Sequence, residues 1–394
     1  MERVWKGRLK KTNKDFLKFT TITDVKGFPG ADYFLFKYEI DGTIAHVKML
    51  IKQKIVKPEI GRRMIKALKE LKNKEKINLE KYEDVHSFVE DYVIKKTGFS
   101  PHIARSRNDQ VILDERLFIR EHSSKIIDLL EKIVFVLSKL SKKYENVEIP
   151  AFTHMQQAAK TTLGYLFNSY AEAFKRDIKR FNYLLELSNE NPLGAVAVAG
   201  TNLPIDRKYV AKLLKFKGVQ KNTIDVVTNR WEFPAEFISA IVFTYIHLST
   251  ISRDIMYFSS LNLIDIGEEF CTGSSVMPHK KNPDFFELLI GKKNSSIGSL
   301  LAIINSGGEF SGYQRLTQEV KWQMIKVCIE FESALKLFPK VIETIKPDKE
   351  KFKRFISKDV ESVELANKLA IEKNISFRKA YEIVANKIRL REKD

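Results

Sequence analysis

Apolar residues recur along much of this chain at spacings of three and four, which is the period of one face of an α-helix. The pattern runs from 126 to 140, from 163 to 185, from 237 to 258 and from 286 to 304. The first of these faces consists of Ile126, Leu130, Ile133, Leu137 and Leu140. We expect each stretch to lie in a helix of roughly 25 to 35 residues, which is about 40 to 50 Å long.

Helices of this length cannot bury a continuous apolar face against one small neighbour, so we expect an elongated bundle that other subunits extend. Both ends of the chain differ from this pattern. Residues 1–100 mix short elements, and after Pro339 two small helices are expected, joined near Asn374. The sequence therefore predicts a mainly α fold with an N-terminal domain at 1–100, a central helical-bundle domain at 101–338 and a small C-terminal helical domain at 339–394.

Composition narrows the class of protein. Of the 394 residues 44% are hydrophobic, which is ordinary for a globular protein. No purely apolar run reaches the roughly 18 residues that would indicate a membrane span. The basic start of the chain lacks an apolar segment with a cleavage site, so we expect no secretory signal and a cytoplasmic location. The two cysteines, Cys271 and Cys328, exclude a disulfide framework and a multi-cysteine metal cluster.

The net charge of +18 raises the question of a polyanionic partner. The lysines alternate with leucines and glutamates, as at 66–76, which is typical of solvated helix faces. No known nucleic-acid-binding motif accompanies them. Nucleic-acid binding is therefore not favoured, and an anionic small substrate accounts for the charge equally well.

Four polar segments interrupt the apolar patterns, each near a predicted helix end: 106–110, 153–157, 273–284 and 313–321. Taken singly, each is typical of a helix cap or a loop. In a bundle, the clefts at helix ends are where polar side chains from distant segments converge. Together the four segments predict a binding site.

The segment GSSVMPHKKNPD at 273–284 combines backbone freedom, hydroxyl groups and cations. Asn282 before a proline predicts a helix N-cap, and the free N–H groups of that helix beside Lys280 predict an anion site. Ser274 becomes a base only if N–H groups, cations or a helix end stabilise its alkoxide, and this segment offers all three. His154, whose unperturbed pKa lies near neutrality, is a candidate partner acid or base, although a lone histidine is more often structural.

The string GSSVMPHKKNP resembles the GSSxMPxKxNP signature of the fumarase/aspartase superfamily, whose members release fumarate by cleaving C–N or C–O bonds. Within that superfamily, further segments in the same order resemble argininosuccinate lyases: EDVHSFVE at 83–90, ARSRNDQV at 104–111, FTHMQQA at 152–158, NPLGAVAVAGTNLPIDR at 191–207, YQRLTQEVK at 313–321 and FRKAYEIV at 377–384. The resemblance covers nearly the whole chain. It implies a mainly helical three-domain subunit, a homotetramer with active sites shared between subunits, and reversible elimination of arginine from argininosuccinate with no metal or organic cofactor.

Carried over position by position, the resemblance implies three catalytic residues. Ser274 would remove the proton next to a substrate carboxylate, His154 would act as acid or base on the leaving guanidino side, and Glu287 would orient that histidine. Which of Ser274 and His154 is the first base stays open, with the serine preferred. The implied substrate-binding residues are Ser106, Asn108, Thr153, Lys280 and Asn282 for the succinyl carboxylates, and Tyr313, Gln318 and Lys321 for the arginine end. His86 matches a further position that lines the site.

The chain departs from the family pattern at several positions. Ala104 stands where a glycine is usual, Thr250 where an arginine near the site is usual, and Leu316 where an aspartate is usual. The segment at 229–237 differs from the usual SDRDFxAEF, and 19–23 lacks a clean match to a substrate-contacting serine. These departures keep two alternatives open: a sibling lyase acting on another succinyl-amine such as adenylosuccinate, and a non-catalytic structural paralogue.

Overall fold

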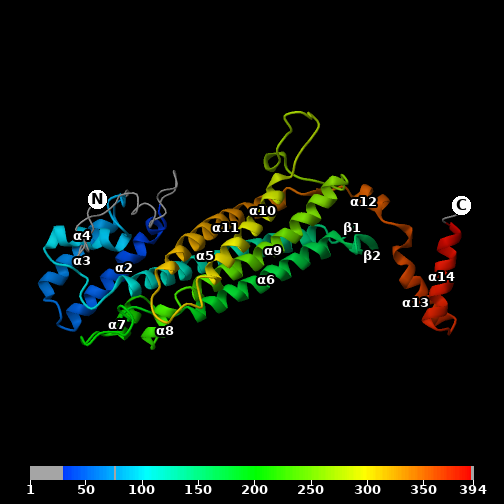
Figure 1. Ribbon diagram of the computed structural model, residues 1–394. Coiled ribbons are helices and arrows are strands. Elements are labelled where there is room, and N and C mark those ends of the chain that lie inside the picture. The colour runs from blue at the N-terminus through cyan, green and yellow to red at the C-terminus, as the bar shows by residue number, and fades with distance from the viewer. Residues whose placement is uncertain (1–29, 75–76, 392–394) are drawn as a thin grey trace. The chain divides into compact units, whose positions relative to one another are not determined.

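Figure 1 shows the mainly helical chain in a computed structural model, which describes residues 30–74 and 77–391. The segment 19–23 lies outside the described residues. The chain divides into two compact units. Among the described residues, unit 1 consists of those up to Asp128, Ile178–Phe243 and Lys292–Ser333. Unit 2 consists of Leu129–Asp177, Thr244–Gly291 and the residues from Ala334 onward. The domain boundaries predicted from the sequence remain a prediction.

Between residues 107 and 343, all of which the structure describes, the chain forms five long helices: α5 (Arg107–Lys143), α6 (Leu163–Leu187), α9 (Glu232–Ser260), α10 (Asp284–Ile304) and α11 (Glu319–Glu343). The first four contain the four apolar patterns recognised in the sequence, so the mainly α prediction is confirmed. The fifth, α11, was not predicted, and it contains Pro339 within its last turns. Each of the five helices contributes residues to both units.

Unit 1 combines parts of these helices with elements that lie wholly within it, and these are α2 (Ala31–Lys52), α3 (Pro58–Lys72), α4 (Val85–Thr97), α7 (Arg207–Leu213), α8 (Thr223–Thr228), the 3-10 turn η2 (Arg315–Gln318) and the parallel pair β3 (Glu190–Asn191) and β4 (Gly218–Val219). Local sequence explains the ends of α4. Asp84 and Ser87 form a reciprocal N-terminal cap, and Gly98 ends the helix at φ 77°. The core of unit 1 includes Met49 and Leu113.

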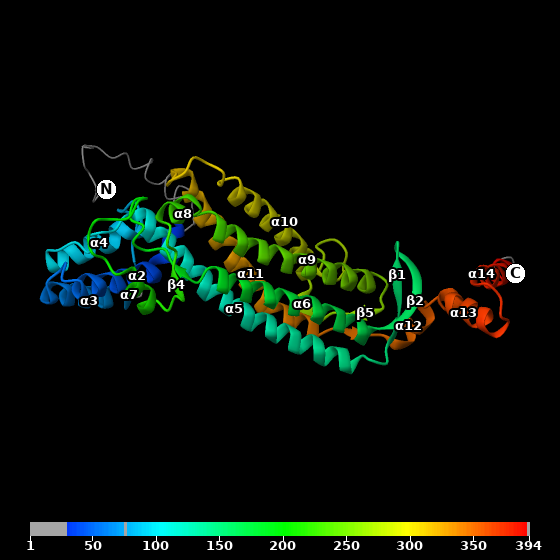
Figure 2. The ribbon, with the colours of Figure 1, turned by 90° about the horizontal axis from the view of Figure 1, so that it is seen from below.

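Unit 2 contains the antiparallel hairpin of β1 (Glu148–Thr153) and β2 (Gln156–Thr162), whose strands lie side by side in Figure 2. Its other short elements are β5 (Ile264–Asp265), β6 (Lys346–Pro347), the 3-10 turns η1 (Glu268–Phe270) and η3 (Lys358–Glu361), α12 (Lys349–Phe355), α13 (Ser362–Glu372) and α14 (Phe377–Arg391). Asn374, at φ 51°, joins α13 to α14, as the sequence predicts. Aromatic pairs pack in the interior of unit 2, and one of them is Phe174 with Phe338, whose ring centroids lie 6.1 Å apart.

Helix α9 is long and apolar enough to cross a membrane by length and composition. In its most apolar stretch of 18 residues, however, 67% of the residues are buried inside the structure. Burial of this kind is typical of a core helix, because a helix surrounded by other helices needs apolar side chains on most of its faces.

Candidate functional site

The polar segment that includes Ser106 forms the N-terminus of α5. The Ser106 Oγ accepts a hydrogen bond from the Asn108 amide at 3.3 Å, and Asp109 accepts one from the Ser106 amide at 3.0 Å, which is a reciprocal cap. The second carboxyl oxygen of Asp109 accepts the amides of Gly194 and Val196 at 2.9 and 2.8 Å. Burial raises the pKa of Asp109 to about 6, although these N–H donors oppose the rise. Asp109 therefore connects the loop at Gly194 and Val196 to the start of α5 through hydrogen bonds.

A pocket of about 90 Å³ lies in unit 1. Four of the predicted substrate-binding residues line it, and they are Asn108, Tyr313, Gln318 and Lys321. His86, the further site-lining position that the resemblance implies, also lines it. The lining residues that the sequence analysis did not single out are Glu83, Asp84, Arg107, Val111, Arg230 and Arg315. Whole ligand sites usually enclose about 300 Å³ or more, so this pocket has room for only part of a substrate.

Carboxylates already hold the cations of this pocket. Glu83 accepts hydrogen bonds from the guanidinium groups of Arg107 and Arg315, each at 3.3 Å. The Lys321 ammonium, which is nearly buried, forms an ion pair with Asp32. An anionic group that enters the pocket must therefore compete with Asp32 and Glu83 for these cations.

A buried ion pair positions Tyr313 at the pocket. Arg230 donates to Glu115 through Nε at 3.1 Å and through Nη2 at 2.6 Å, and its Nη1 donates to the Tyr313 hydroxyl at 3.0 Å. The side chains of Arg230 and Glu115 are 1% and 3% exposed. Burial lowers the pKa of Arg230, but the Glu115 carboxylate more than offsets this and raises the pKa above its ordinary value. The guanidinium thus stays charged, and it holds the tyrosine ring in place.

His86 belongs to a buried cluster with Glu39 and Asp114. The Glu39 Oε2 lies 2.8 Å from the His86 Nδ1, and Asp114 lies 3.8 Å from the same nitrogen. Burial raises the pKa of Glu39, but His86 and Arg105 outweigh it, so the pKa is lowered. Burial and the Glu39 charge raise the pKa of Asp114 well above its ordinary value. These pKa shifts favour the charged form of Glu39 and the protonated form of Asp114. Among the described residues, the His86 Nε2 has no hydrogen-bond partner.

His154 lies at the tip of the hairpin of β1 and β2, and not near a helix end as the sequence predicted. Thr153 pairs with Gln156, and the two residues between them, His154 and Met155, have φ values of 51° and 61°. Two-residue hairpin turns with positive φ at both positions usually contain asparagine or glycine. The prediction was wrong because His-Met carries no such turn signal. Both Thr153 and His154 are exposed, and strained non-glycine residues of this kind cluster at functional sites.

Ser274 lies in a loop between α9 and α10 that is closed at its neck. Thr272 and Asn282 exchange backbone hydrogen bonds of 3.0 and 2.8 Å, and the Asn282 side chain donates to the Gly273 carbonyl at 3.2 Å. Helix α10 begins at Asp284, whose carboxylate accepts the Thr272 amide at 3.0 Å. The Asn282 side chain therefore serves the closure of the loop, where the sequence predicted a helix cap.

The Ser274 Oγ accepts two backbone hydrogen bonds inside this loop, from the amides of Val276 at 3.2 Å and Met277 at 3.0 Å. N–H donors stabilise an oxygen most strongly when that oxygen is negatively charged. The loop also carries Lys280, which is exposed, and Lys281, which pairs with Asp265 at 2.9 Å. The Ser274 Oγ thus accepts amide donors of the kind that would stabilise an alkoxide, in a loop that also carries two lysines.

The predicted site residues fall into two groups. Ser106, Asn108, Tyr313, Gln318 and Lys321 belong to unit 1, and Thr153, His154, Ser274, Lys280, Asn282 and Glu287 belong to unit 2. Glu287 is exposed near the start of α10. Among the described residues of one chain, no hydrogen bond or ion pair joins Ser274 with His154 or Glu287.

The three departures at single positions differ in their structural setting. Ala104 has φ 58°, in the left-handed region where glycine carries no steric penalty, so the glycine usual at this position has a backbone reason. Thr250 is exposed on α9 and donates to the Ile246 carbonyl at 3.3 Å. Leu316 is 41% exposed beside the residues that line the pocket.

Comparison with known proteins identifies a family. A family model described as Lyase matches residues 31–298. Argininosuccinate lyases of Caldicellulosiruptor saccharolyticus and Caldanaerobacter subterraneus subsp. tengcongensis are 34% and 36% identical to this chain. The matches cover 98% and 97% of this chain, and 84% and 87% of the two relatives.

Solved structures show the same fold. An EDDS lyase in complex with formate has a TM-score of 0.82 at 24% identity, over 97% of this chain and 77% of that one. A class II fumarase of Schistosoma mansoni has a TM-score of 0.75 at 16% identity, over 93% of this chain and 91% of that one. At these identities the likeness concerns the fold alone.

Proposed function

This chain belongs to the argininosuccinate lyase family, and we propose that it catalyses the reversible elimination of arginine from argininosuccinate to give fumarate. The observation that carries the proposal is the surroundings of Ser274, whose Oγ accepts two backbone amides in a loop that also holds lysines. A serine serves as a base only where such groups stabilise its alkoxide.

In the proposed reaction Ser274 takes the C–H proton next to a carboxylate of the substrate. The negative charge that develops on that carboxylate is stabilised by Lys280 and by N–H donors, because fixed cations and dipoles need no reorganisation as the charge forms. The C–N bond then breaks, and His154 gives a proton to the guanidino nitrogen of the departing arginine. Glu287 orients the imidazole. Metal ions and organic cofactors have no step in this scheme.

The strained turn at His154 supports its role. Two adjacent non-glycine residues with positive φ cost of order 1–3 kcal/mol each, and such strain persists where a function needs it. The turn holds the imidazole outside the hairpin, on an exposed side chain, where a substrate can reach it.

Substrate binding is proposed for two groups of residues. Ser106, Asn108, Thr153, Lys280 and Asn282 bind the succinyl carboxylates, and Tyr313, Gln318 and Lys321 bind the arginine end. The ion pair of Lys321 with Asp32 supports a binding step in which a substrate carboxylate takes over the ammonium group. The pocket of about 90 Å³ is too small for the whole substrate, which agrees with a site completed by other segments.

The proposal includes a homotetramer whose active sites are shared between subunits, in the cytoplasm and without nucleic acid as a partner. Large apolar side chains on the long helices support an assembly, because exposed apolar surface is costly in a monomer. On α10 these side chains include Leu288 at 61%, Leu301 at 55% and Ile304 at 44% exposure. Sedimentation of the purified chain measures the assembly directly.

The decisive test is release of fumarate from argininosuccinate and, in parallel, from adenylosuccinate. We expect turnover of argininosuccinate and at least about a 1000-fold loss of kcat in Ser274→Ala, since a lost general base costs factors of this size. The neighbouring Ser275, which is exposed, provides the matched control, and Ser275→Ala should stay within about tenfold of the unmodified protein.

Three results would overturn the proposal in different ways. Turnover of adenylosuccinate alone would assign a sibling lyase. No turnover of either substrate by a folded tetramer would favour a structural paralogue. Near-normal rates in Ser274→Ala would refute the assignment of the base while leaving the reaction in place.

A further inference from the structure

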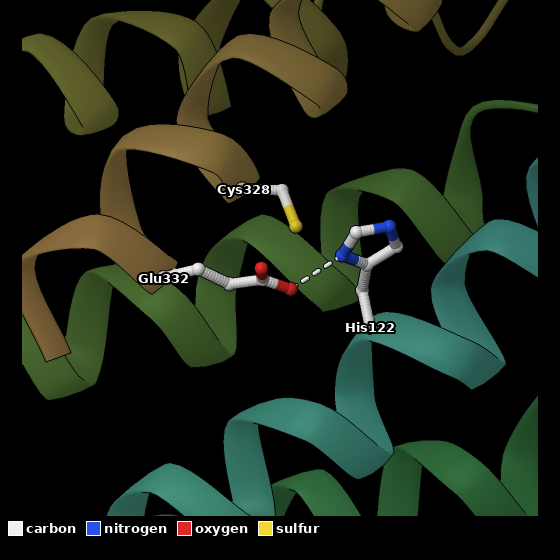
Figure 3. Close-up of side chains that lie close together, drawn as sticks. All are labelled: His122, Cys328 and Glu332. Carbon is white, nitrogen blue, oxygen red and sulfur yellow. Dashed lines mark hydrogen bonds and ion pairs between the residues drawn. The ribbon is translucent and has the colours of Figure 1, made fainter. Parts of the chain in front are cut away.

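Three side chains that the proposed reaction does not use meet in unit 1, and Figure 3 shows them pointing toward one another. Cys328 and Glu332 lie one turn apart on α11, and His122 faces them from α5. The Nδ1 of His122 lies 2.5 Å from the Glu332 Oε1. A ring nitrogen of His122, the Cys328 sulfur and a Glu332 oxygen all lie within 4.8 Å of one another.

The chemistry of the three donors matches a divalent transition metal of the zinc class. Thiolate sulfur, imidazole nitrogen and carboxylate oxygen are the ligands that Zn²⁺ takes in proteins, at about 2.0 to 2.3 Å. Tetrahedral bonds of that length place ligand atoms roughly 3.3 to 3.8 Å apart. The Nδ1 and Oε1 must therefore separate by about 1 Å, which small side-chain rotations achieve.

Charge and access also suit an ion. A divalent cation with one thiolate, one carboxylate and a neutral imidazole is a neutral unit, so its burial does not leave a net charge in the interior. The Cys328 residue is fully buried, whereas the His122 and Glu332 side chains are each 12% exposed and leave one side open to water. The Phe118 ring stacks on the imidazole at 4.0 Å between centroids and restricts its rotation.

We propose that His122, Cys328 and Glu332 bind one zinc-class divalent ion per chain, with water as the fourth ligand. Binding replaces the thiol proton of Cys328 by the metal, and it moves the imidazole proton from Nδ1 to Nε2, so that Nδ1 coordinates. The ion links α5 to α11 within unit 1 and stabilises their packing. The site is separate from the proposed catalytic residues and does not depend on the lyase assignment.

Cobalt provides the readout, because Co²⁺ bound by a thiolate gives a sulfur-to-cobalt charge-transfer band in the near ultraviolet. The full chain is stripped with a chelator, dialysed under a non-thiol reductant and titrated with Co²⁺, and Zn²⁺ is then added in competition. We expect the band to saturate at one equivalent, to disappear when zinc is added, and excess zinc to raise the melting temperature by about 5 °C.

The variants assign the ligands. Cys328→Ser should abolish the band and weaken binding by at least about 100-fold, and Glu332→Gln should weaken it by at least about 10-fold. Cys271→Ser removes the other cysteine of the chain and should match the unmodified protein. Circular dichroism checks the fold of each variant, and Glu332→Gln carries the test if Cys328→Ser does not fold.

A band that survives in Cys328→Ser or disappears in Cys271→Ser would overturn the site, and so would affinity unchanged in Glu332→Gln. The absence of a band in the unmodified protein, at cobalt far in excess of the chain, would show that His122 and Glu332 form only a hydrogen bond between two helices.

Discussion

Replacing Glu115 by glutamine removes the negative charge that pairs with Arg230 and keeps the shape of the side chain. In the unmodified protein Nε and Nη2 of Arg230 donate to Glu115 at 3.1 and 2.6 Å, and both side chains are almost completely buried. The partners that remain, the hydroxyl groups of Tyr313 and Thr317 at 3.0 and 3.5 Å, are neutral. Among the described residues, the variant therefore leaves the buried guanidinium with no carboxylate in an ion pair.

Breaking a buried ion pair from one side costs about 3 to 5 kcal/mol, because the remaining charge keeps its full desolvation penalty. For a chain of 394 residues we expect Glu115→Gln to lower the melting temperature by about 4 to 6 °C. Calorimetry or circular dichroism during heating measures the change. The released Tyr313 should also raise KM more than it lowers kcat, since the tyrosine is proposed to bind substrate.

Two control variants test whether the loss of stability comes from the buried ion pair. Glu59→Gln removes one partner of the exposed pair with Arg62, whose side chains are 72% and 68% exposed, and it should cost less than about 1 kcal/mol. The double variant Glu115→Leu, Arg230→Met removes both buried charges and should recover most of the lost stability. If Glu115→Gln and Glu59→Gln have the same melting temperature, the buried ion pair of Glu115 and Arg230 does not carry the predicted desolvation penalty.

Two further predictions concern the backbone and pH. Ala104→Gly should raise the free energy of unfolding by about 0.5 to 1 kcal/mol in urea denaturation, because φ 58° strains alanine; an unchanged midpoint would mean that the strain is absent. Burial lowers the pKa of His46 to about 3, so the unfolded chain takes up a proton below its ordinary pKa while the folded chain does not. The free energy of unfolding therefore decreases as pH falls, by about 2 kcal/mol between pH 7 and 5. The variant His46→Gln can still donate to the Ile103 carbonyl, and its stability should not show this decrease. Urea denaturation at both pH values measures the decrease, and an equal decrease in the two proteins would contradict the prediction.

The sequence predicted the long helices because helix periodicity is a local property. Apolar residues at spacings of three and four place Ile133 and Leu137 on one face whatever lies opposite, and both are fully buried. The turn between α13 and α14 was equally local, since Asn374 tolerates the positive φ that the structure has there. The loop at Ser274 was recognisable from its own residues and its family signature.

Only the tertiary structure decided which distant residues meet. It placed His154 on a hairpin turn whose residues give no turn signal, paired Lys321 with Asp32, and held Tyr313 with Arg230. It also brought Cys328 to His122 and Glu332, which the count of two cysteines did not predict. The physical reason is that these contacts join side chains of separate segments, and spacing along a chain does not determine how separate segments pack against one another.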